Sequence, residues 1–414
     1  MRLLAKQGSM KAVSAPASAP FRLAWAVFSG LAALLVGIGL SRFGYTPLVP
    51  VLIRAGWLDS TQAAYAGAAN LAGYLIGAVA ISRLHRPELE LLLTRLALTA
   101  CTVSFIACAH PLGLAWFSGW RGLSGIAGAV LMILTPHRVL AVAPVRWRGR
   151  IAGVMFLGVG LGIALSASIT PWILRLGLPQ TWICLASLSA LLAGLAWWGF
   201  PKSSMSVKPC SAPLASEAKP AAAASLATHP GTMLVVAAYS LSAAGYAPHT
   251  VFWVDFIARG LGAGMRAGAA NWLLFGLAAT AAPLLLGLLA DRIGFAAAFR
   301  LSLLVSALSA GLPLVSTAPW SLALSSLGVG GLQLGCSSLD SARLTGLLPE
   351  DRRRLVWGWM TTGYSVFYAA GGYGASYLFG HTASYVLLFG IGAATLAAAA
   401  LVDSLASLTT GARP

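Results

Sequence analysis

Two arginines lie inside apolar stretches of the sequence, where charged side chains are rare. Arg42 lies about 20 residues beyond Arg22 in one apolar run, and Arg121 lies in the run 112–136. A guanidinium is a planar fork of donors that stays charged at physiological pH and matches a carboxylate in shape. Because no Asp or Glu lies comparably deep in the apolar runs, the pair predicts a site for a carboxylate or a similar small organic anion.

A structural role is the alternative for both arginines. A charge near the middle of a bilayer costs about 2.5–3.5 kcal/mol on insertion scales, so it is expected to face protein or a water-filled cavity. Backbone carbonyls freed at glycine or proline would satisfy a guanidinium without any substrate. This alternative weighs more for Arg42, because Pro47 and Pro50 free carbonyls within its reach, than for Arg121.

Five neutral polar side chains are further candidates for substrate contact. His249 is the only one of six histidines inside a predicted helix, and its imidazole is also a candidate for proton coupling. A hydrogen bond to a neighbouring helix is the alternative for His249. Tyr45 and Tyr246 either line a cavity or pack. Asn70 and Asn271 need partners when buried, so they either bridge helices or bind ligand.

Charged residues near predicted helix ends are candidates for gates. Arg54 and Asp255 would meet on the outer side and latch an outer gate. Asp255 is also the second candidate for proton coupling, with simple solvation at the membrane surface as its alternative. An inner gate is expected where the eighth and tenth helices end, from Asp291, Arg292, Asp340 and Arg343. Of these, Asp291 is expected to cap the N-terminus of the fifth helix while the inner side is closed.

The elements that must position these residues are membrane-spanning helices. The 414-residue chain is 58% hydrophobic and 9% charged, against about 25% charged in soluble domains. At about 20 residues per span, this composition predicts an all-α polytopic membrane protein with 12 transmembrane helices. Apolar runs fall at 22–53, 61–82, 90–109, 112–136, 151–175, 179–200, 231–257, 267–290, 295–315, 319–342, 355–379 and 383–407.

The runs divide into two sets of six. We expect an N-terminal bundle at 22–200 and a C-terminal bundle at 231–407, joined by a cytoplasmic linker at 201–230 rich in Pro, Ala, Ser and Lys. Segments 1–21 and 408–414 are expected to be cytoplasmic tails, the first of them disordered.

The two halves repeat one another. Three blocks recur in the same order, at offsets of 201 to 205 residues. The first is AGAAN at 66–70 and 267–271, and the second pairs Gly44-Tyr45-Thr46-Pro47 with Gly245-Tyr246-Ala247-Pro248. The third pairs Arg138, Pro144, Gly153, Met155 and Gly158 with Arg343, Pro349, Gly358, Met360 and Gly363. A parallel repeat of two six-helix bundles is typical of secondary transporters that bind substrate between the halves.

Basic residues predict the orientation. With the N-terminus inside, 21 of the 27 Lys and Arg residues fall in cytoplasmic segments and four in outer loops. The positive-inside rule then places both termini in the cytoplasm, and we expect a multi-pass protein of an inner or plasma membrane. The net charge of +17 is thus an orientation signal rather than a sign of nucleic-acid binding.

Motifs for other chemistry do not occur in the sequence. The five cysteines form no C-x-x-C pair, and neither H-E-x-x-H nor a Walker A loop is found. We therefore expect no metal, no cofactor and no enzymatic activity; a membrane-embedded enzyme or a sensor is the remaining alternative. The expected partners are a small-molecule substrate, protons and the lipid bilayer, with no nucleic acid, and the chain is expected to be a monomer.

Three segments resemble the major facilitator superfamily. Gly287-Leu-Leu-Ala-Asp291-Arg292-Ile-Gly294 is similar to its G-x-L-a-D-r-x-G signature, and the segment from Arg121 to Gly128 to its second motif. The segment from Gly37 to Pro50 is similar to the YbfB/YjiJ branch. The resemblance implies the major facilitator fold of two pseudo-symmetric six-helix bundles, and it implies proton coupling or substrate binding for Arg121. The chain departs from the pattern at Ile81-Ser82-Arg83, which lacks the acid, and in its fifth helix, which lacks the Gly-Pro pair of antiporters.

These observations predict a secondary active transporter that works by alternating access on a small organic anion, a carboxylate, with proton coupling or exchange. The alternative is efflux of apolar or neutral compounds, such as drugs, sugars or amino acids, with Phe252, Trp253 and Tyr364 dominating the cavity.

Overall fold

The computed structural model describes residues 18–84, 86–201, 229–348 and 350–410. Most of the predicted linker and tails lies outside these residues. The first helix, however, begins at Ser18, within the segment expected to be a tail, and the last continues to Thr410. Throughout the described ranges the regular secondary structure is helical. This confirms the all-α fold.

Helix 1 is the most irregular of the six helices in the N-terminal half. It consists of α1 (Ser18–Leu34), a π-helical turn η1 (Leu35–Leu40), a 3-10 segment η2 (Phe43–Leu48) and α2 (Val49–Arg54). Pro47 lies inside η2 and has no N–H to continue an α-helical ladder. The other helices of this half are α3 (Ser60–Ser82), α4 (Glu90–Ala107) preceded by η3 (Pro87–Leu89), α5 (Gly113–Val142) followed by η4 (Val145–Trp147), α6 (Arg148–Ile173) extended by η5 (Leu174–Leu176), and α7 (Leu178–Trp197).

The C-terminal half also has six helices. They are α9 (Pro230–Asp255) extended by η6 (Phe256–Gly260), α10 (Gly264–Ile293), α11 (Phe295–Val315), α12 (Pro319–Leu347), α13 (Glu350–Thr382) and α14 (Tyr385–Thr410). Ten of the twelve helices in the described ranges are long and apolar enough to cross a membrane. The two others, α9 and α13, line the space between the halves with tyrosine, serine and threonine side chains, which lowers their hydropathy.

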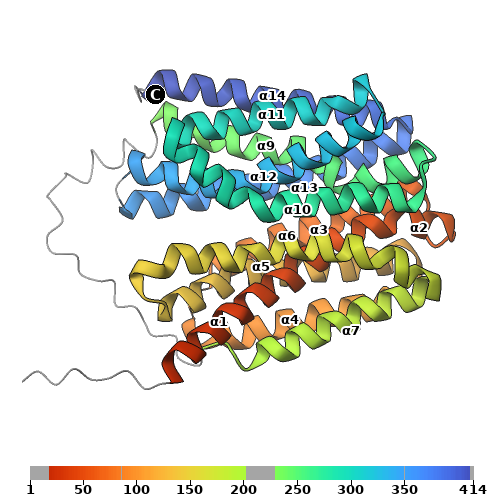
Figure 1. The fold of residues 1–414 in the computed structure, drawn as a ribbon, viewed down its shortest axis with the longest axis horizontal. Helices are drawn as coiled ribbons and strands as arrows, with labels where there is room; N and C mark the ends of the chain where they lie inside the picture. Colours follow the sequence, from red (N-terminus) through yellow and green to blue (C-terminus); the bar gives the residue numbers. More distant parts are fainter. Residues whose placement is uncertain (1–17, 85, 202–228, 349, 411–414) are drawn as a thin grey trace, which may run out of the picture.

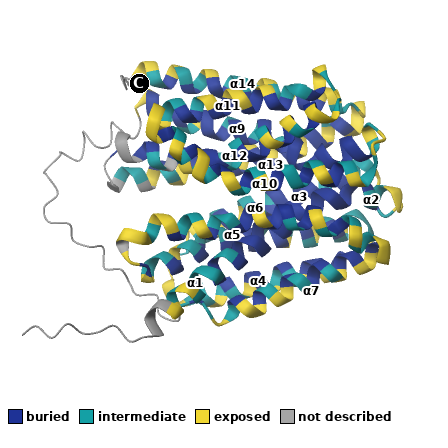
Figure 2. Ribbon diagram, in the orientation of Figure 1, coloured by how far each residue is buried: buried dark blue, intermediate teal, exposed yellow. Residues whose placement is uncertain are grey.

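The halves lie side by side with their helices roughly parallel (Figure 1). Across the interface α3 packs against α13 and α6 against α10, so the second helix of each half meets the fifth of the other. Small residues permit this approach: a Cβ added at Gly276 of α10 would lie 2.5 Å from the backbone nitrogen of Ala164 in α6. Buried residues concentrate in the middle of the bundle and exposed ones on its outer faces (Figure 2).

Equivalent polar contacts confirm the repeat. Asn70 Nδ2 donates to Ser124 Oγ (2.9 Å) between α3 and α5, and Ser326 Oγ donates to Asn271 Oδ1 (3.1 Å) between α12 and α10. We call the side on which α1 begins and α14 ends the terminal side, and the side of Arg54 the opposite side; in Figure 1 the terminal side is on the left. That the terminal side is cytoplasmic stays a prediction.

Candidate functional site

A cavity of about 450 Å³ lies between the two halves. This volume lies within the range of small-molecule sites. Its lining runs from Arg42 in helix 1 to Trp357, near the terminal-side end of α13. Among the described residues that line it, Arg42 is the only charged one. Eight aromatic side chains are among the described residues that line the cavity: Phe43, Tyr74, Phe156, Tyr239, Tyr246, Trp357, Tyr364 and Tyr368. Hydroxyl and amide groups come from Gln333, Ser337, Ser338, Thr361 and Ser365.

The Arg42 guanidinium lies among aromatic rings. Its Cζ is 4.2 Å from the ring centroid of Tyr368, 5.0 Å from that of Tyr74 and 5.6 Å from that of Phe43. Within the described structure, Nε and one terminal nitrogen of Arg42 are buried and have no hydrogen-bond acceptor. Cation–π contacts hold the group in place but leave its donors unused. Arg42 is therefore a cation held by aromatic rings at the edge of the cavity, with two buried donors unused.

Arg121 is bound to the backbone of helix 1. Its side chain, 2% exposed, reaches from α5 to the break between η1 and η2. There it donates to the carbonyl oxygens of Ser41 and Arg42, the second at 3.3 Å, and its Cζ lies 4.4 Å from the Tyr45 ring centroid. Both carbonyls lie at the irregular turn, where the α-helical hydrogen bonding of helix 1 is interrupted, and buried carbonyls require donors.

Carbonyl binding, the structural alternative considered for both arginines, is thus what Arg121 does in this structure. The sequence argument favoured Arg42 for this role because of Pro47. Near Pro47, it is Trp272 Nε1 of α10 that donates to a helix 1 carbonyl, that of Phe43 (3.2 Å). Arg121 binds the carbonyls at the break in helix 1, and the Arg42 side chain lines the cavity.

The predicted tyrosines and asparagines divide between the cavity and the helix contacts. Tyr246 lines the cavity, stacked between Phe275 (6.2 Å between ring centroids) and Tyr368 (5.7 Å). Tyr45 does not line it and donates from its hydroxyl to the Ala63 carbonyl (2.9 Å). Asn70 and Asn271 bridge helices, which is the structural alternative considered for both.

His249 lies outside the cavity. It is fully buried in the C-terminal half, with Nε2 3.3 Å from Ser325 Oγ and its ring stacked on Trp253 at 4.8 Å. Phe389 of α14 covers another side, with its ring centroid 4.7 Å away. This is the hydrogen bond to a neighbouring helix that was the alternative for His249.

The opposite side is closed by hydrogen bonds between the halves. Thr46 Oγ1 donates to the Thr250 carbonyl (2.5 Å), Arg54 donates to the Ala258 carbonyl (3.2 Å), and Arg259 donates to Ser60 Oγ (2.8 Å). Trp272 adds its bond to helix 1. These contacts leave the larger cavity on the terminal side of the closure.

The predicted ion pair between Arg54 and Asp255 is not the one formed in this conformation. Asp255 pairs with Arg259, one turn further along the same helix (2.7 Å), and accepts a hydrogen bond from the Tyr385 hydroxyl (2.5 Å). Arg259 therefore connects Asp255 to Ser60 of the other half. The offset between the halves led to the choice of Arg54, but a residue four positions away in the same helix is already within reach.

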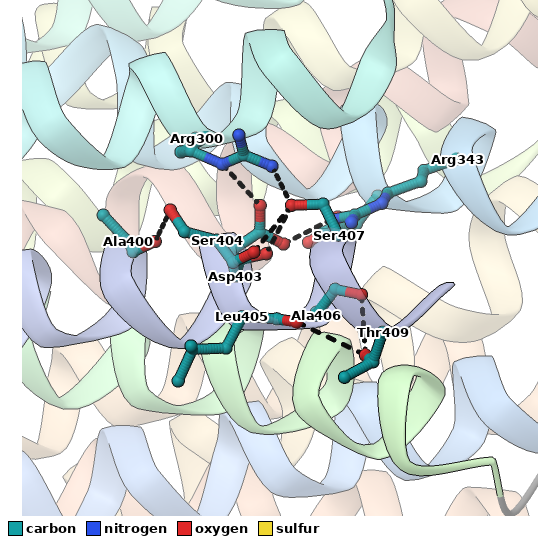
Figure 3. Close-up of polar contacts among 10 residues, drawn as sticks. Arg300, Arg343, Ala400, Asp403, Ser404, Leu405, Ala406, Ser407 and Thr409 are labelled. Atoms are coloured by element: carbon teal, nitrogen blue, oxygen red, sulfur yellow. Dashed lines mark hydrogen bonds and ion pairs between the residues drawn. The ribbon is translucent and has the colours of Figure 1, made fainter. Parts of the chain in front are cut away.

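On the terminal side the expected cluster has different members. Figure 3 shows Arg300 of α11 and Arg343 of α12 directed at Asp403 of α14. Arg300 Nε is 3.4 Å from Asp403 Oδ2, Arg343 also pairs with Asp403, and Asp340 lies 4.0 Å from Arg343.

Asp291 and Arg292 do not join this cluster, because both are exposed at the end of α10. Arg95 and Arg138 of the N-terminal half lie 205 residues before Arg300 and Arg343. They donate to the carbonyls of Trp197, at the end of α7, and of Pro201, and Arg138 also pairs with Glu90 (3.5 Å). Asp403 was missed because it lies within an apolar run near its predicted end.

Gln333 is the cavity residue that sequence reasoning missed most clearly. Its side chain is 3% exposed, it lines the cavity, and within the described structure neither Nε2 nor Oε1 has a hydrogen-bond partner. The offset of 202 that relates Ser124 to Ser326 places Leu131 at the equivalent position of α5. A polar residue where the repeat has leucine was the available signal.

Comparison with known proteins gives one family match. A family model described as "Uncharacterised MFS-type transporter YbfB" matches residues 34–404. No curated protein matches the chain.

Solved structures of transporters share the fold. A D-xylose-proton symporter superposes with a TM-score of 0.74 at 16% identity, covering 93% of this chain and 97% of its own. The nucleoside transporter NupG (D323A mutant) gives 0.69 at 13% identity, covering 93% and 99%. A bacterial homologue of the human lysosomal transporter Spinster, in an inward-facing and unoccupied conformation, gives 0.62 at 12%, covering 96% and 97%. At these identities the likeness concerns the fold alone.

Proposed function

Because the chain belongs to the YbfB family of MFS-type transporters, we propose that it is a secondary active transporter that moves a small organic anion by alternating access. The anion is a carboxylate with an apolar or aromatic body. It binds in the 450 Å³ cavity between the halves.

The free donors of Arg42 carry this proposal. Nε and one terminal nitrogen have no acceptor, and no Asp or Glu is among the described residues that line the cavity. A carboxylate supplies two acceptor oxygens and the missing negative charge at once. Desolvating a guanidinium without such a partner is costly, so the binding free energy of an anion includes relief of that cost.

The aromatic lining supports an apolar body on the same substrate. Tyr74 and Tyr368 hold the guanidinium, while Tyr239, Tyr364 and Trp357 extend the aromatic surface toward the terminal side. Apolar area removed from water contributes about 25 cal/mol per Å². An amphipathic anion would use both kinds of surface.

Alternating access would require the opposite side to open while the terminal side closes. In this conformation the opposite side is held by the bonds of Thr46, Arg54 and Arg259 to the other half. We propose that these residues form the outer gate. The buried cluster of Asp340, Arg343 and Asp403 would anchor the terminal-side ends of α12 and α14 during the exchange.

Proton coupling is assigned to Asp255 rather than His249. Asp255 is bound to Arg259 and Tyr385 within the closed outer gate. Opening that side would break the Arg259 contact with Ser60 and admit water to the carboxylate, which is where a proton would be exchanged. His249 is enclosed by Trp253, Phe389 and Ser325 and meets neither the cavity nor the gate. Asp255→Asn is expected to weaken the dependence of transport on a proton gradient while leaving exchange of substrate for substrate intact.

The anion proposal is tested by comparing acids with their amides. Purified protein is screened by thermal shift against monocarboxylates and the matching primary amides, for example benzoate with benzamide. A ligand that binds the folded state raises the unfolding temperature by mass action. We expect acids to stabilise and their amides not to. The labelled acid that stabilises most is then used for uptake into liposomes.

Two arginine variants separate the site from the overall charge. Arg42→Gln should abolish both stabilisation and uptake. Arg175→Gln removes the same charge from an exposed residue beside Trp172 and should change neither. Normal uptake of the acid by Arg42→Gln would contradict the anion proposal.

The eight aromatic side chains among the described residues that line the cavity favour a second candidate, export of apolar or neutral compounds. Amides would then stabilise as well as acids, and Arg42→Gln would bind both.

A further inference from the structure

A second, much smaller cavity lies beside Arg42, between the halves. Its volume is about 20 Å³, enough for a particle about the size of a water molecule. It shares Arg42, Phe43 and Tyr368 with the larger cavity. The remaining wall includes Arg121 and Gly67. Two guanidinium groups therefore border a space of single-atom size.

Neither arginine at this cavity has a negative partner. In the described residues, the ion pairs of Asp and Glu are formed with basic side chains other than Arg42 and Arg121. No Asp or Glu is among the described residues that line the small cavity. Arg121 is 2% exposed and its Nε has no acceptor, although its terminal nitrogens bind helix 1. Two buried charges of like sign so close together call for a counter-ion.

The other polar groups around the cavity have already used their donors. Thr46 donates to the Thr250 carbonyl, Tyr368 donates to the Thr250 hydroxyl (3.0 Å), and Asn70 donates to Ser124 and to the Arg121 carbonyl. Thr250 itself donates to the Ala247 carbonyl. The unused donors at this cavity thus belong to the guanidiniums of Arg42 and Arg121. They favour a ligand that accepts hydrogen bonds and donates none.

The repeat does not carry arginine at either position. The offset of 201 places Ala243 at the equivalent of Arg42, and the offset of 202 places Ala323 at the equivalent of Arg121. Ala243 lies in α9, which continues as an α-helix where helix 1 is broken. The two arginines and the break in helix 1 are thus confined to the N-terminal half.

We propose that the small cavity binds a halide ion, chloride in the cell. The ion is compact, accepts several hydrogen bonds and carries the charge that Arg42 and Arg121 lack. It would neutralise the pair while the larger cavity holds no substrate. This site shares Arg42 with the one proposed for the organic anion but lies in the smaller cavity, and its test uses no organic substrate.

Gly67 offers a variant that fills the cavity without touching either arginine. A Cβ added at Gly67 would lie 3.5 Å from the nearest atoms of Tyr45 and Val251, an ordinary contact, and both of these residues also line the cavity. Gly67→Ala therefore adds a methyl group where the ion would sit. Gly311→Ala is the matched control, since its Cβ would also meet only an ordinary contact, 3.7 Å from the Ala393 side chain.

The unfolding temperature is measured as sodium gluconate is replaced by sodium chloride at constant ionic strength. We expect chloride to raise it in the wild type and in Gly311→Ala, with saturation. Gly67→Ala should bind chloride at least tenfold more weakly. A rise that persists unchanged in Gly67→Ala would overturn the location, and equal unfolding temperatures in both salts would overturn the site.

Crystals grown with sodium bromide provide a second readout on the unmodified chain. Anomalous scattering should place bromide between the Arg42 and Arg121 guanidiniums. Density for water alone at that position would overturn the proposal.

Discussion

Replacing Arg121 with alanine should destabilise the fold more than replacing Arg42. Arg121 donates to the carbonyl oxygens of Ser41 and Arg42, at the break between η1 and η2 of helix 1. Hydrogen bonds that involve a charged group contribute about 1.5–3 kcal/mol each, so the two contribute roughly 3–6 kcal/mol. The Arg42 side chain makes three ring contacts but no hydrogen bond within the described residues, and its contribution to stability comes from cation–π attraction alone.

Relief of charge desolvation applies to both variants, because removing either guanidinium removes a cost of burial. Only Arg121→Ala also removes hydrogen bonds to buried carbonyls. We therefore expect Arg121→Ala to lower the free energy of unfolding by at least about 2 kcal/mol. Arg42→Ala should lose less stability than Arg121→Ala and should lose ligand binding.

Reversible unfolding in mixed micelles, followed by tryptophan fluorescence, gives the stability of both variants. Thermal shift with the acid identified by screening gives ligand binding. Arg121→Ala with wild-type stability, or Arg42→Ala with the larger loss, would refute the division of roles between the two arginines.

Three further predictions concern the cavity and the two ends of the molecule. Gln333→Leu should keep or raise the unfolding temperature, because an unsatisfied buried amide costs about 1–3 kcal/mol, while changing which acids bind; a clear drop in stability would contradict this. Arg259→Ala should raise the population of molecules open on the opposite side by roughly tenfold, because the Arg259 bond to Ser60 contributes about 1.5 kcal/mol. Distances between spin labels on the two halves measure this population. An unchanged distance distribution would argue against the gate. Asp403→Asn should cost about 3–5 kcal/mol in thermal unfolding because two arginines lose their buried partner, whereas Glu90→Gln, at a partly exposed pair, should cost less; similar losses would contradict the buried-cluster argument.

Several features of the fold were predictable because they depend on composition and local pattern. Twelve apolar runs predicted the twelve helices, and the repeated Asn of AGAAN predicted that α3 and α10 occupy equivalent places. Asn70 and Asn271 then make equivalent contacts with Ser124 and Ser326. Such contacts follow once two similar sequences fold in the same way.

Partner choice was less predictable. The Arg54–Asp255 pair came from the repeat offset, yet Asp255 binds Arg259 in its own helix and Tyr385 from α14. Asp403 lies in an apolar run and becomes part of a cluster only because α11, α12 and α14 converge on it. Distances between side chains of different helices depend on packing, which the sequence pattern does not report.

By itself the sequence determined that this is a membrane protein of two repeated halves with two arginines in its interior, because charge and apolar length decide what a bilayer accepts. Only the tertiary structure decided which arginine has free donors. Helix 1 is broken where Gly39 meets α6 so closely that an added Cβ would lie 2.6 Å from Gly162 Cα. Arg121 is the side chain that reaches the carbonyls at that break, and the Arg42 side chain lines the cavity without a hydrogen-bond partner among the described residues.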